Sequence, residues 1–155
     1  MHNPSVYLCP VDIQSKTYTT PMLAGGRKNK LSTYLMNGSL NGFSFPPKNQ
    51  SCKVTQVWNP LCYLLWEPDE TAATPPANEY NDGAGFPGLA SGGGGQEGIG
   101  TLHNKHGGNA LAMDAHVQLV TVQDFLQDST TPPGKGPGPG GKTFLWWSPY
   151  SSDGH

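Results

Sequence analysis

A chain of 155 residues with a formal net charge of −2 and nine scattered Lys and Arg residues gives no reason to expect nucleic-acid binding. Only 35% of the residues are hydrophobic, 21 are Gly and 15 are Pro, and the longest apolar run, residues 61–66, is too short to span a membrane. We therefore expect a single loop-rich α+β domain over residues 1–155, built on a small antiparallel sheet with one or two short helices.

The first predicted elements are short. Residues 6–9 form a strand-like apolar run that Pro10 stops. In residues 31–36, every second side chain would face one way, which predicts a second strand, and Asn37-Gly38 then offers the positive φ that a tight turn requires. Residues 53–58 fit one or two helical turns, which end before Pro60.

Residues 61–66 are apolar on both faces of a strand, so this run is predicted to be the central and most buried strand. Residues 71–98 are rich in Gly, Pro, Ala and Asn and have no periodicity. We expect a long flexible surface loop there.

Residues 110–120 predict a β-hairpin at the centre of the sheet. An apolar run, residues 110–113, precedes Asp114-Ala115, and residues 116–120 alternate polar and apolar side chains. Asp114-Ala115 is predicted to form a two-residue turn. A type I′ turn would place Ala115 at positive φ, which costs alanine roughly 1 kcal/mol.

A short helix is predicted to follow the hairpin directly. Thr121 and Asp124 have the spacing of a capping box, and the helix should end near Asp128. A second flexible loop, residues 129–142, separates this helix from residues 143–149, which are predicted to form a closing strand.

The hairpin region resembles bacterial pilin-like proteins that carry a prepilin-type N-terminal cleavage and methylation segment and a C-terminal His-X9-Asp-Gly signature. This chain departs from the signature in two ways: Ala115 stands where the family has Gly, and counting back to the signature His reaches Asn104, between two histidines. The residues of the signature hairpin are His103, His106, Asn109, Asp114 and His116.

Weaker pieces of the same resemblance lie elsewhere in the chain. Cys-Pro-Val-Asp at residues 9–12 resembles the family's Cys-Pro-Ser-Asp, and residues 32–38 resemble its Ser-Tyr-x-x-Asn-Gly element. Residues 64–67 resemble its Leu-Leu-x-Glu, and residues 145–149 resemble the Leu-Trp-Trp-x-Pro ending of some members.

The resemblance implies a structural role and no enzymatic activity. The chain would be the head domain of a type IV pilin-like or type II secretion pseudopilin subunit, periplasmic or at the cell surface, with other pilin-like subunits as its filament partners. Such proteins are anchored in the inner membrane by an N-terminal helix. The chain begins in polar residues, so we expect it to be the soluble C-terminal part of a longer protein.

A metal-binding module or metal-dependent hydrolase is the main alternative. Imidazole and carboxylate side chains that converge where the hairpin folds back would suit zinc or iron, although no helix fixes their geometry. We expect turn and surface roles for these residues instead. The candidate ligands are His103, His106, Asp114 and His116.

Calcium is the second metal considered, because pseudopilins of type II secretion bind it in a C-terminal loop. The spacing of the available carboxylates matches no calcium loop, so solvated side chains are the preferred interpretation. These carboxylates belong to Glu67, Asp69, Glu70, Glu79 and Asp82.

Two further alternatives concern cysteine and tryptophan. Cys52 and Cys62 are close enough in sequence to form a disulfide across a loop, and buried free thiols are the other interpretation. Trp146 and Trp147 would form a carbohydrate-binding platform if both were exposed. We expect them to close the core instead, as aromatic residues near a terminus commonly do.

Overall fold

The computed structural model describes residues 4–24, 26–42, 52–69, 83–85, 87 and 98–155. Within this part of the chain, one five-stranded sheet has the strand order β3-β1-β2-β4-β5. Its strands are β1 (Leu35–Asn37), β2 (Tyr63–Trp66), β3 (Ala84–Gly85), β4 (Gly107–Ala112) and β5 (Val117–Thr121). The expected small α+β fold is confirmed, but the sheet is mixed rather than antiparallel, because β1 and β3 pair in parallel.

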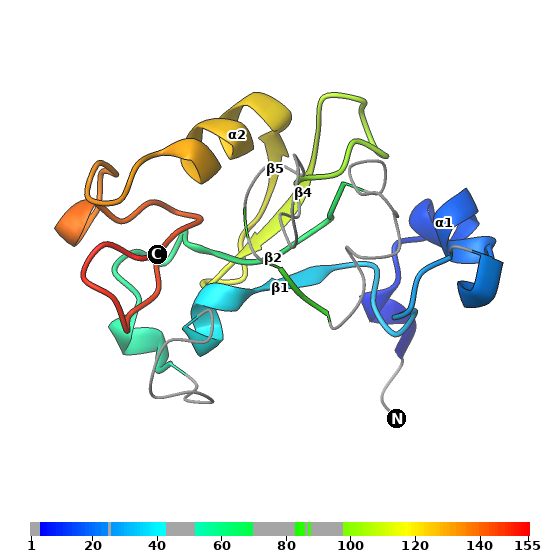
Figure 1. Cartoon of the computed structure of the whole chain (residues 1–155), viewed down its shortest axis with the longest axis horizontal. Helices are drawn as coiled ribbons and strands as arrows, with labels where there is room; N and C mark the ends of the chain where they lie inside the picture. Colours follow the sequence, from blue (N-terminus) through cyan, green and yellow to red (C-terminus); the bar gives the residue numbers. More distant parts are fainter. Residues whose placement is uncertain (1–3, 25, 43–51, 70–82, 86, 88–97) are drawn as a thin grey trace.

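Short helices surround the sheet. In Figure 1, α2 runs along the top of the sheet, and the N-terminal segment with α1 lies at the opposite end from the C-terminus. No described helix is long and apolar enough to cross a membrane. The α-helices are α1 (Lys16–Thr19) and α2 (Val122–Thr130), and the 3₁₀ turns are η1 (Pro4–Tyr7), η2 (Asp12–Gln14), η3 (Met22–Ala24), η4 (Gly38–Asn41), η5 (Val54–Gln56) and η7 (Pro139–Gly141).

Strand β2 occupies the centre of the sheet, as the apolar run at residues 61–66 predicted. Trp66 is fully buried, and its ring centroid lies 5.6 Å from that of Phe125 on α2. The strand begins at Tyr63, two residues after the start of the run, and Leu61, the first residue of the run, is 39% exposed. The main cluster of buried hydrophobic residues comprises Tyr63, Trp66, Ile99, Ala110, Val120, Phe125 and Leu145.

The predicted hairpin is present as β4 and β5, but its position and turn differ from the prediction. Because β5 is an edge strand, the hairpin does not lie at the centre of the sheet. The Ala112 N–H donates to His116 O (2.8 Å) and the Ala115 N–H donates to Ala112 O (3.0 Å). These bonds close a three-residue loop, in which Ala115 alone has positive φ (69°).

Helix α2 begins as the capping box predicted. The Thr121 hydroxyl accepts a hydrogen bond from the Asp124 N–H (3.0 Å), and Phe125 is buried against the sheet. The helix ends at Thr130 rather than near Asp128. The hydroxyls of Ser129 and Thr130 both donate to the Leu126 carbonyl in this last turn.

The two N-terminal strand predictions were largely wrong. Residues 4–7 form the 3₁₀ turn η1. Val6 is 71% and Tyr7 57% exposed, so these two side chains lie at the surface rather than in the core. The second strand is only Leu35–Asn37, and Leu31 is 86% exposed. Alternation over a few residues did not distinguish a strand from an extended surface segment.

Asn37 does not form the expected positive-φ turn. It has φ −63° and caps η4, its side chain accepting a hydrogen bond from the Ser39 N–H. Its side-chain amide also donates to Tyr63 O (3.1 Å) and Leu145 O (2.9 Å). Asn37 therefore joins β1, β2 and the C-terminal segment at a fully buried position.

The C-terminal segment packs as a turn, not as the predicted strand. The Thr143 hydroxyl accepts hydrogen bonds from the N–H groups of Leu145 (3.2 Å) and Trp146 (2.8 Å). This turn buries Leu145, Trp146 and Trp147, three consecutive residues that a flat strand would divide between two faces. The expectation that the tryptophans close the core is confirmed, so they form no exposed carbohydrate platform.

The two segments predicted to be flexible loops, residues 71–98 and 129–142, differ in how many of their residues the structure describes. Most of residues 71–98 lies outside the described part of the chain. Residues 132–142 carry internal backbone hydrogen bonds, including those from the Gly136 N–H to Gly141 O and from the Gly138 N–H to Lys142 O.

Candidate metal centre

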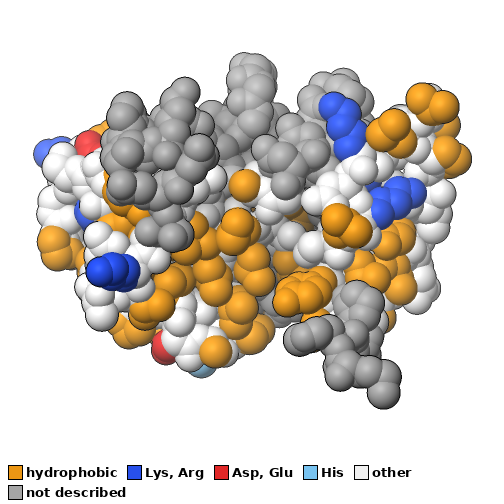
Figure 2. All heavy atoms as spheres, turned by 90° about the horizontal axis from the view of Figure 1, so that it is seen from below, with side chains coloured by type: hydrophobic (Ala, Val, Ile, Leu, Met, Phe, Trp, Pro, Cys, Tyr) orange, Lys and Arg blue, Asp and Glu red, His pale blue; other side chains and the backbone are white. Residues whose placement is uncertain are grey.

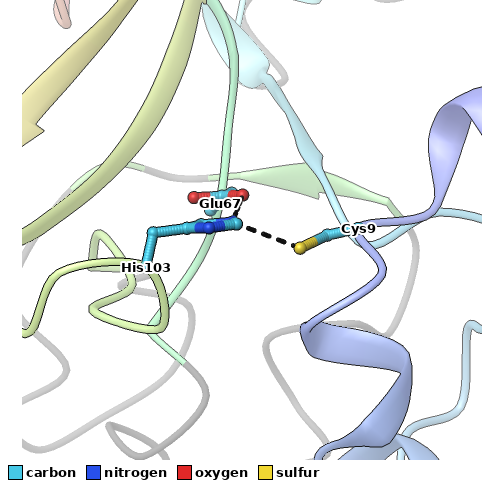
Figure 3. A group of neighbouring side chains, drawn as sticks. All are labelled: Cys9, Glu67 and His103. Atoms are coloured by element: carbon cyan, nitrogen blue, oxygen red, sulfur yellow. Dashed lines mark hydrogen bonds and ion pairs between the residues drawn. The ribbon is translucent and has the colours of Figure 1, made fainter.

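Three segments that are distant in sequence bring their side chains to one point. Cys9 follows η1, Glu67 directly follows β2, and His103 lies on the turn before β4 (Figure 3). His103 Nε2 lies 2.9 Å from Glu67 Oε1 and 3.3 Å from Cys9 Sγ. One ligand atom from each residue lies within 4.8 Å of the other two.

The backbone around Cys9 is fixed by Thr33, the residue two positions before β1. The Cys9 N–H donates to the Thr33 hydroxyl (2.6 Å), and the Thr33 N–H donates to Tyr7 O (2.9 Å). Cys9 and Thr33 are each 1% exposed. These two hydrogen bonds hold the backbone on which Cys9 lies, so its thiol is kept at a buried position.

The carboxylate of Glu67 is oriented by strand β4. The Asn109 N–H donates to Glu67 Oε2 (2.8 Å), which leaves Oε1 directed at His103. The Glu67 backbone is fixed as well, because its N–H donates to Asn109 O and its carbonyl accepts from the Gly100 N–H. Only glycine fits at residue 100, since a Cβ there would lie 2.6 Å from Pro68 O.

His103 is the accessible member of the group. Its side chain is 33% exposed, whereas that of Glu67 is 7% exposed. The turn that carries it is closed by the Lys105 N–H donating to Thr101 O (2.9 Å), and Lys105 has φ 65°. Cys9 and Glu67 are therefore buried, and His103 is the side chain of the site that solvent reaches.

The contact pattern favours ligation over nucleophilic catalysis. In a Cys-His-carboxylate triad, the two imidazole nitrogens serve different partners, one facing the nucleophile and the other the carboxylate. Here both contacts are made by Nε2 of His103. Sulfur, nitrogen and oxygen atoms that converge in this way form a donor set suited to zinc or a similar transition metal.

The electrostatic surroundings of the group are negative. Burial, and then the charges of Cys9, Glu67 and Asp12, raise the pKa of Tyr34. Asp12 is itself neutralised by Arg27, whose Nη1 donates to Asp12 Oδ2 (2.6 Å), and both side chains are buried. The charge of Asp12 is therefore balanced by that of Arg27.

The structure brings only one of the four predicted metal ligands, His103, into this group. His106, Asp114 and His116 are exposed, and among the described residues the only three-residue group of potential ligands is Cys9, Glu67 and His103. Asp114 has a structural role instead. Its carboxylate accepts a hydrogen bond from the His116 N–H (2.9 Å) and its N–H donates to Pro60 O.

Sequence analysis missed Cys9 as a ligand and considered Glu67 only for calcium, because no local pattern connects either residue to His103. Asn109, a member of the resembled signature, contacts the site through its backbone N–H rather than its side chain. The one usable sequence signal was Cys9 itself, the cysteine left unpaired by the predicted disulfide.

Of the two interpretations of Cys52 and Cys62, the structure has free thiols rather than a disulfide, with Cys62 buried and Cys52 partly buried. Burial raises the pKa of the Cys62 thiol to about 12 and also raises that of Cys52. Cys62 is therefore an unreactive core residue. Of the carboxylates considered for calcium, Glu67 belongs to the present group, while Glu70, Glu79 and Asp82 lie outside the described residues.

Comparison with family models, with curated proteins and with solved structures gives no match to this chain.

Proposed function

We propose that this chain is the head domain of a pilin-like subunit of the type IV pilin or type II secretion class. The observation that carries the proposal is that the separate segments resembling this family contact one another in the fold. Each match is weak evidence alone, so the proposal rests on all of them together with these contacts.

Two sets of hydrogen bonds join these segments directly. Glu67 exchanges hydrogen bonds with Asn109 in the signature hairpin. The Asn37 amide donates to Leu145 O in the Leu-Trp-Trp-x-Pro segment. The Cys-Pro-Val-Asp segment joins this network through Cys9, which lies against His103.

The surface also suits a subunit that packs against neighbours. Hydrophobic side chains gather on the face shown in Figure 2. In the part of the chain that the structure describes, six of the exposed large hydrophobic residues fall between residues 6 and 31, and exposed apolar side chains of this kind are suited to contact with another subunit. They are Val6, Tyr7, Val11, Met22, Leu23 and Leu31.

Cross-linking in the source cells tests the proposal. Single Leu23→Cys and Leu31→Cys variants of the full-length protein would be treated with a bismaleimide, with the unmodified protein as background. Lys135→Cys, at an exposed residue outside the N-terminal region, is the matched control. Because each variant adds one thiol that reacts once, we expect a covalent dimer from the leucine sites, in the envelope or sheared-filament fraction.

Only monomers from both leucine variants, or protein confined to the cytosolic fraction, would overturn the proposal. A cross-linked dimer from Lys135→Cys in the same yield as that from Leu23→Cys would show aggregation rather than an ordered contact.

A further inference from the structure

We propose that Cys9, Glu67 and His103 form a three-ligand site for a divalent transition metal ion, with Zn²⁺ the best fit. This site is independent of the role in a filament. It uses one ligand atom from each residue: Cys9 Sγ, Glu67 Oε1 and His103 Nε2 (Figure 3).

The distances are close to those of a tetrahedral site. Zinc bonds of about 2.0–2.3 Å at tetrahedral angles place neighbouring ligand atoms roughly 3.3–3.6 Å apart. The Cys9 Sγ to His103 Nε2 distance is 3.3 Å, a few tenths of an ångström shorter than the about 3.6 Å that a sulfur–nitrogen pair takes on zinc. The His103 Nε2 to Glu67 Oε1 distance is 2.9 Å, so ligation requires only a small outward movement of the accessible imidazole.

A single ion would also resolve a conflict in the hydrogen bonding. Nε2 of His103 faces both a sulfur and a carboxylate oxygen, yet one N–H cannot point at both. A metal at the centre of the three atoms binds a neutral imidazole, a carboxylate and a thiolate together. The bonds formed are metal–sulfur, metal–nitrogen and metal–oxygen, and the thiol proton is released to solvent.

The second layer of contacts resembles that of metal sites. The Glu67 oxygen that faces away from His103 accepts from the Asn109 N–H, and the Cys9 backbone is fixed by Thr33. Such outer contacts hold ligands in position before the ion arrives. Cys9 and Glu67 are buried and rigidly supported, and His103 on its turn provides the route of entry.

The donor set decides the class of metal. A sulfur ligand disfavours Ca²⁺ and Mg²⁺, which prefer oxygen, and a mixed sulfur, nitrogen and oxygen set suits Zn²⁺ or Co²⁺. Three protein ligands leave the fourth tetrahedral position to solvent or to a small molecule. The ion would also tie the N-terminal segment to the end of β2 and to the turn before β4.

Cobalt titration tests the site. The purified chain, reduced with a phosphine and freed of metal with EDTA, would be titrated with Co²⁺ alone. We expect saturation at one equivalent, with the visible bands of tetrahedral Co²⁺ and a near-ultraviolet sulfur-to-cobalt charge-transfer band. Added Zn²⁺ should displace the cobalt and bleach both.

Two variants and two matched controls assign the ligands. His103→Ala changes an exposed residue and should fold. Loss of a contact that only supports a ligand lowers metal affinity about 10–100-fold, and we expect the Co²⁺ affinity of His103→Ala to fall by more than this. Cys9→Ser should lose the charge-transfer band. His106→Ala, on the same turn, and Cys52→Ser, a free thiol elsewhere, should titrate like the unmodified protein.

Thermal melting provides a second readout. Zn²⁺ should raise Tm in the unmodified protein and in both controls, but not in His103→Ala, whose metal-free Tm verifies folding. Absence of tetrahedral cobalt bands in the unmodified protein would overturn the proposal. Full binding by His103→Ala together with loss in His106→Ala would assign the metal to other residues and also refute it.

Discussion

The hairpin region and the N-terminal region of this molecule differ in how their structure is determined. Strands β4 and β5 and helix α2 follow one another along the chain, and the two strands pair with each other across one short loop. The described part of residues 4–34 has no strand pairing of this kind before β1, and side-chain contacts such as Thr33 with Cys9 and Asp12 with Arg27 hold its short turns. Local sequence patterns therefore describe the first region well and the second poorly.

The largest expected effect comes from the buried ion pair of the N-terminal region. Asp12→Ala leaves the Arg27 guanidinium buried without its carboxylate, and we expect a loss of about 3–5 kcal/mol in the free energy of unfolding. Chemical denaturation measures it. Asp153→Asn, which changes a partly exposed contact with His155, is the control and should cost less than about 1 kcal/mol. Equal effects would mean that the N-terminal region is not organised by this pair.

An intermediate effect concerns Asp128 at the end of α2. Burial, and then the charge of Asp124, raise the pKa of Asp128 to about 6 from its ordinary value of 3.8. The folded state therefore binds the proton more tightly than the unfolded state. Asp128 favours folding below about pH 4, and this contribution is lost as the pH rises through about 6.

We accordingly expect Asp128→Asn to stabilise the protein by about 2 kcal/mol at pH 8 and by much less at pH 4. Denaturation curves at both pH values measure the difference. Asp124→Asn, at an exposed position on the same helix, should give a smaller change. A gain from Asp128→Asn that is the same at both pH values would exclude the carboxylate charge as its cause.

A smaller effect is expected from the helix cap. Thr121→Ala removes the hydroxyl that accepts from the Asp124 N–H, and should cost about 1 kcal/mol. Thr121→Ser retains the hydroxyl and should restore most of the stability. If serine and alanine were equally destabilising, the cap hydrogen bond would not be the cause.

The smallest effect is a gain in the hairpin loop. Ala115 has φ 69°, which glycine adopts without the steric cost of a Cβ, so Ala115→Gly should raise stability by about 0.5–1 kcal/mol. Ala112→Gly, at the last residue of β4, where the side chain is fully buried, is the control and should be destabilising. A loss of stability in Ala115→Gly would contradict the positive φ at this residue.

Sequence reasoning succeeded where a pattern is local. It predicted the central strand from the apolar run ending at Trp66, the hairpin from its alternation and the helix from its Thr121 cap. It failed to predict the buried, bridging role of Asn37, because the carbonyls bonded by its amide belong to Tyr63 and Leu145. The tryptophan segment was correctly expected to be buried but wrongly predicted as a strand, because the local turn closed by the Thr143 hydroxyl was not recognised.

The candidate site was only partly predictable for the same reason. His103 was selected by its residue type and its closeness to the hairpin. Its partners, Cys9 and Glu67, meet it only after β2 and β4 pair and the N-terminal segment packs against them. The spacing of residues along the chain does not show which distant segments will come into contact. The predicted metal ligands were therefore residues that lie close to His103 in the sequence.

The most direct test of the link between the two regions is amide hydrogen exchange with and without Zn²⁺. The bound ion should slow exchange at the amides of Cys9 and Thr33, whose hydrogen bonds support the site, while Leu119 on β5 provides an internal reference that changes little. Slower exchange at Cys9 and Thr33, absent in His103→Ala, is the result the account predicts. Unchanged exchange at both amides on saturation with Zn²⁺, or protection confined to the hairpin, would contradict it.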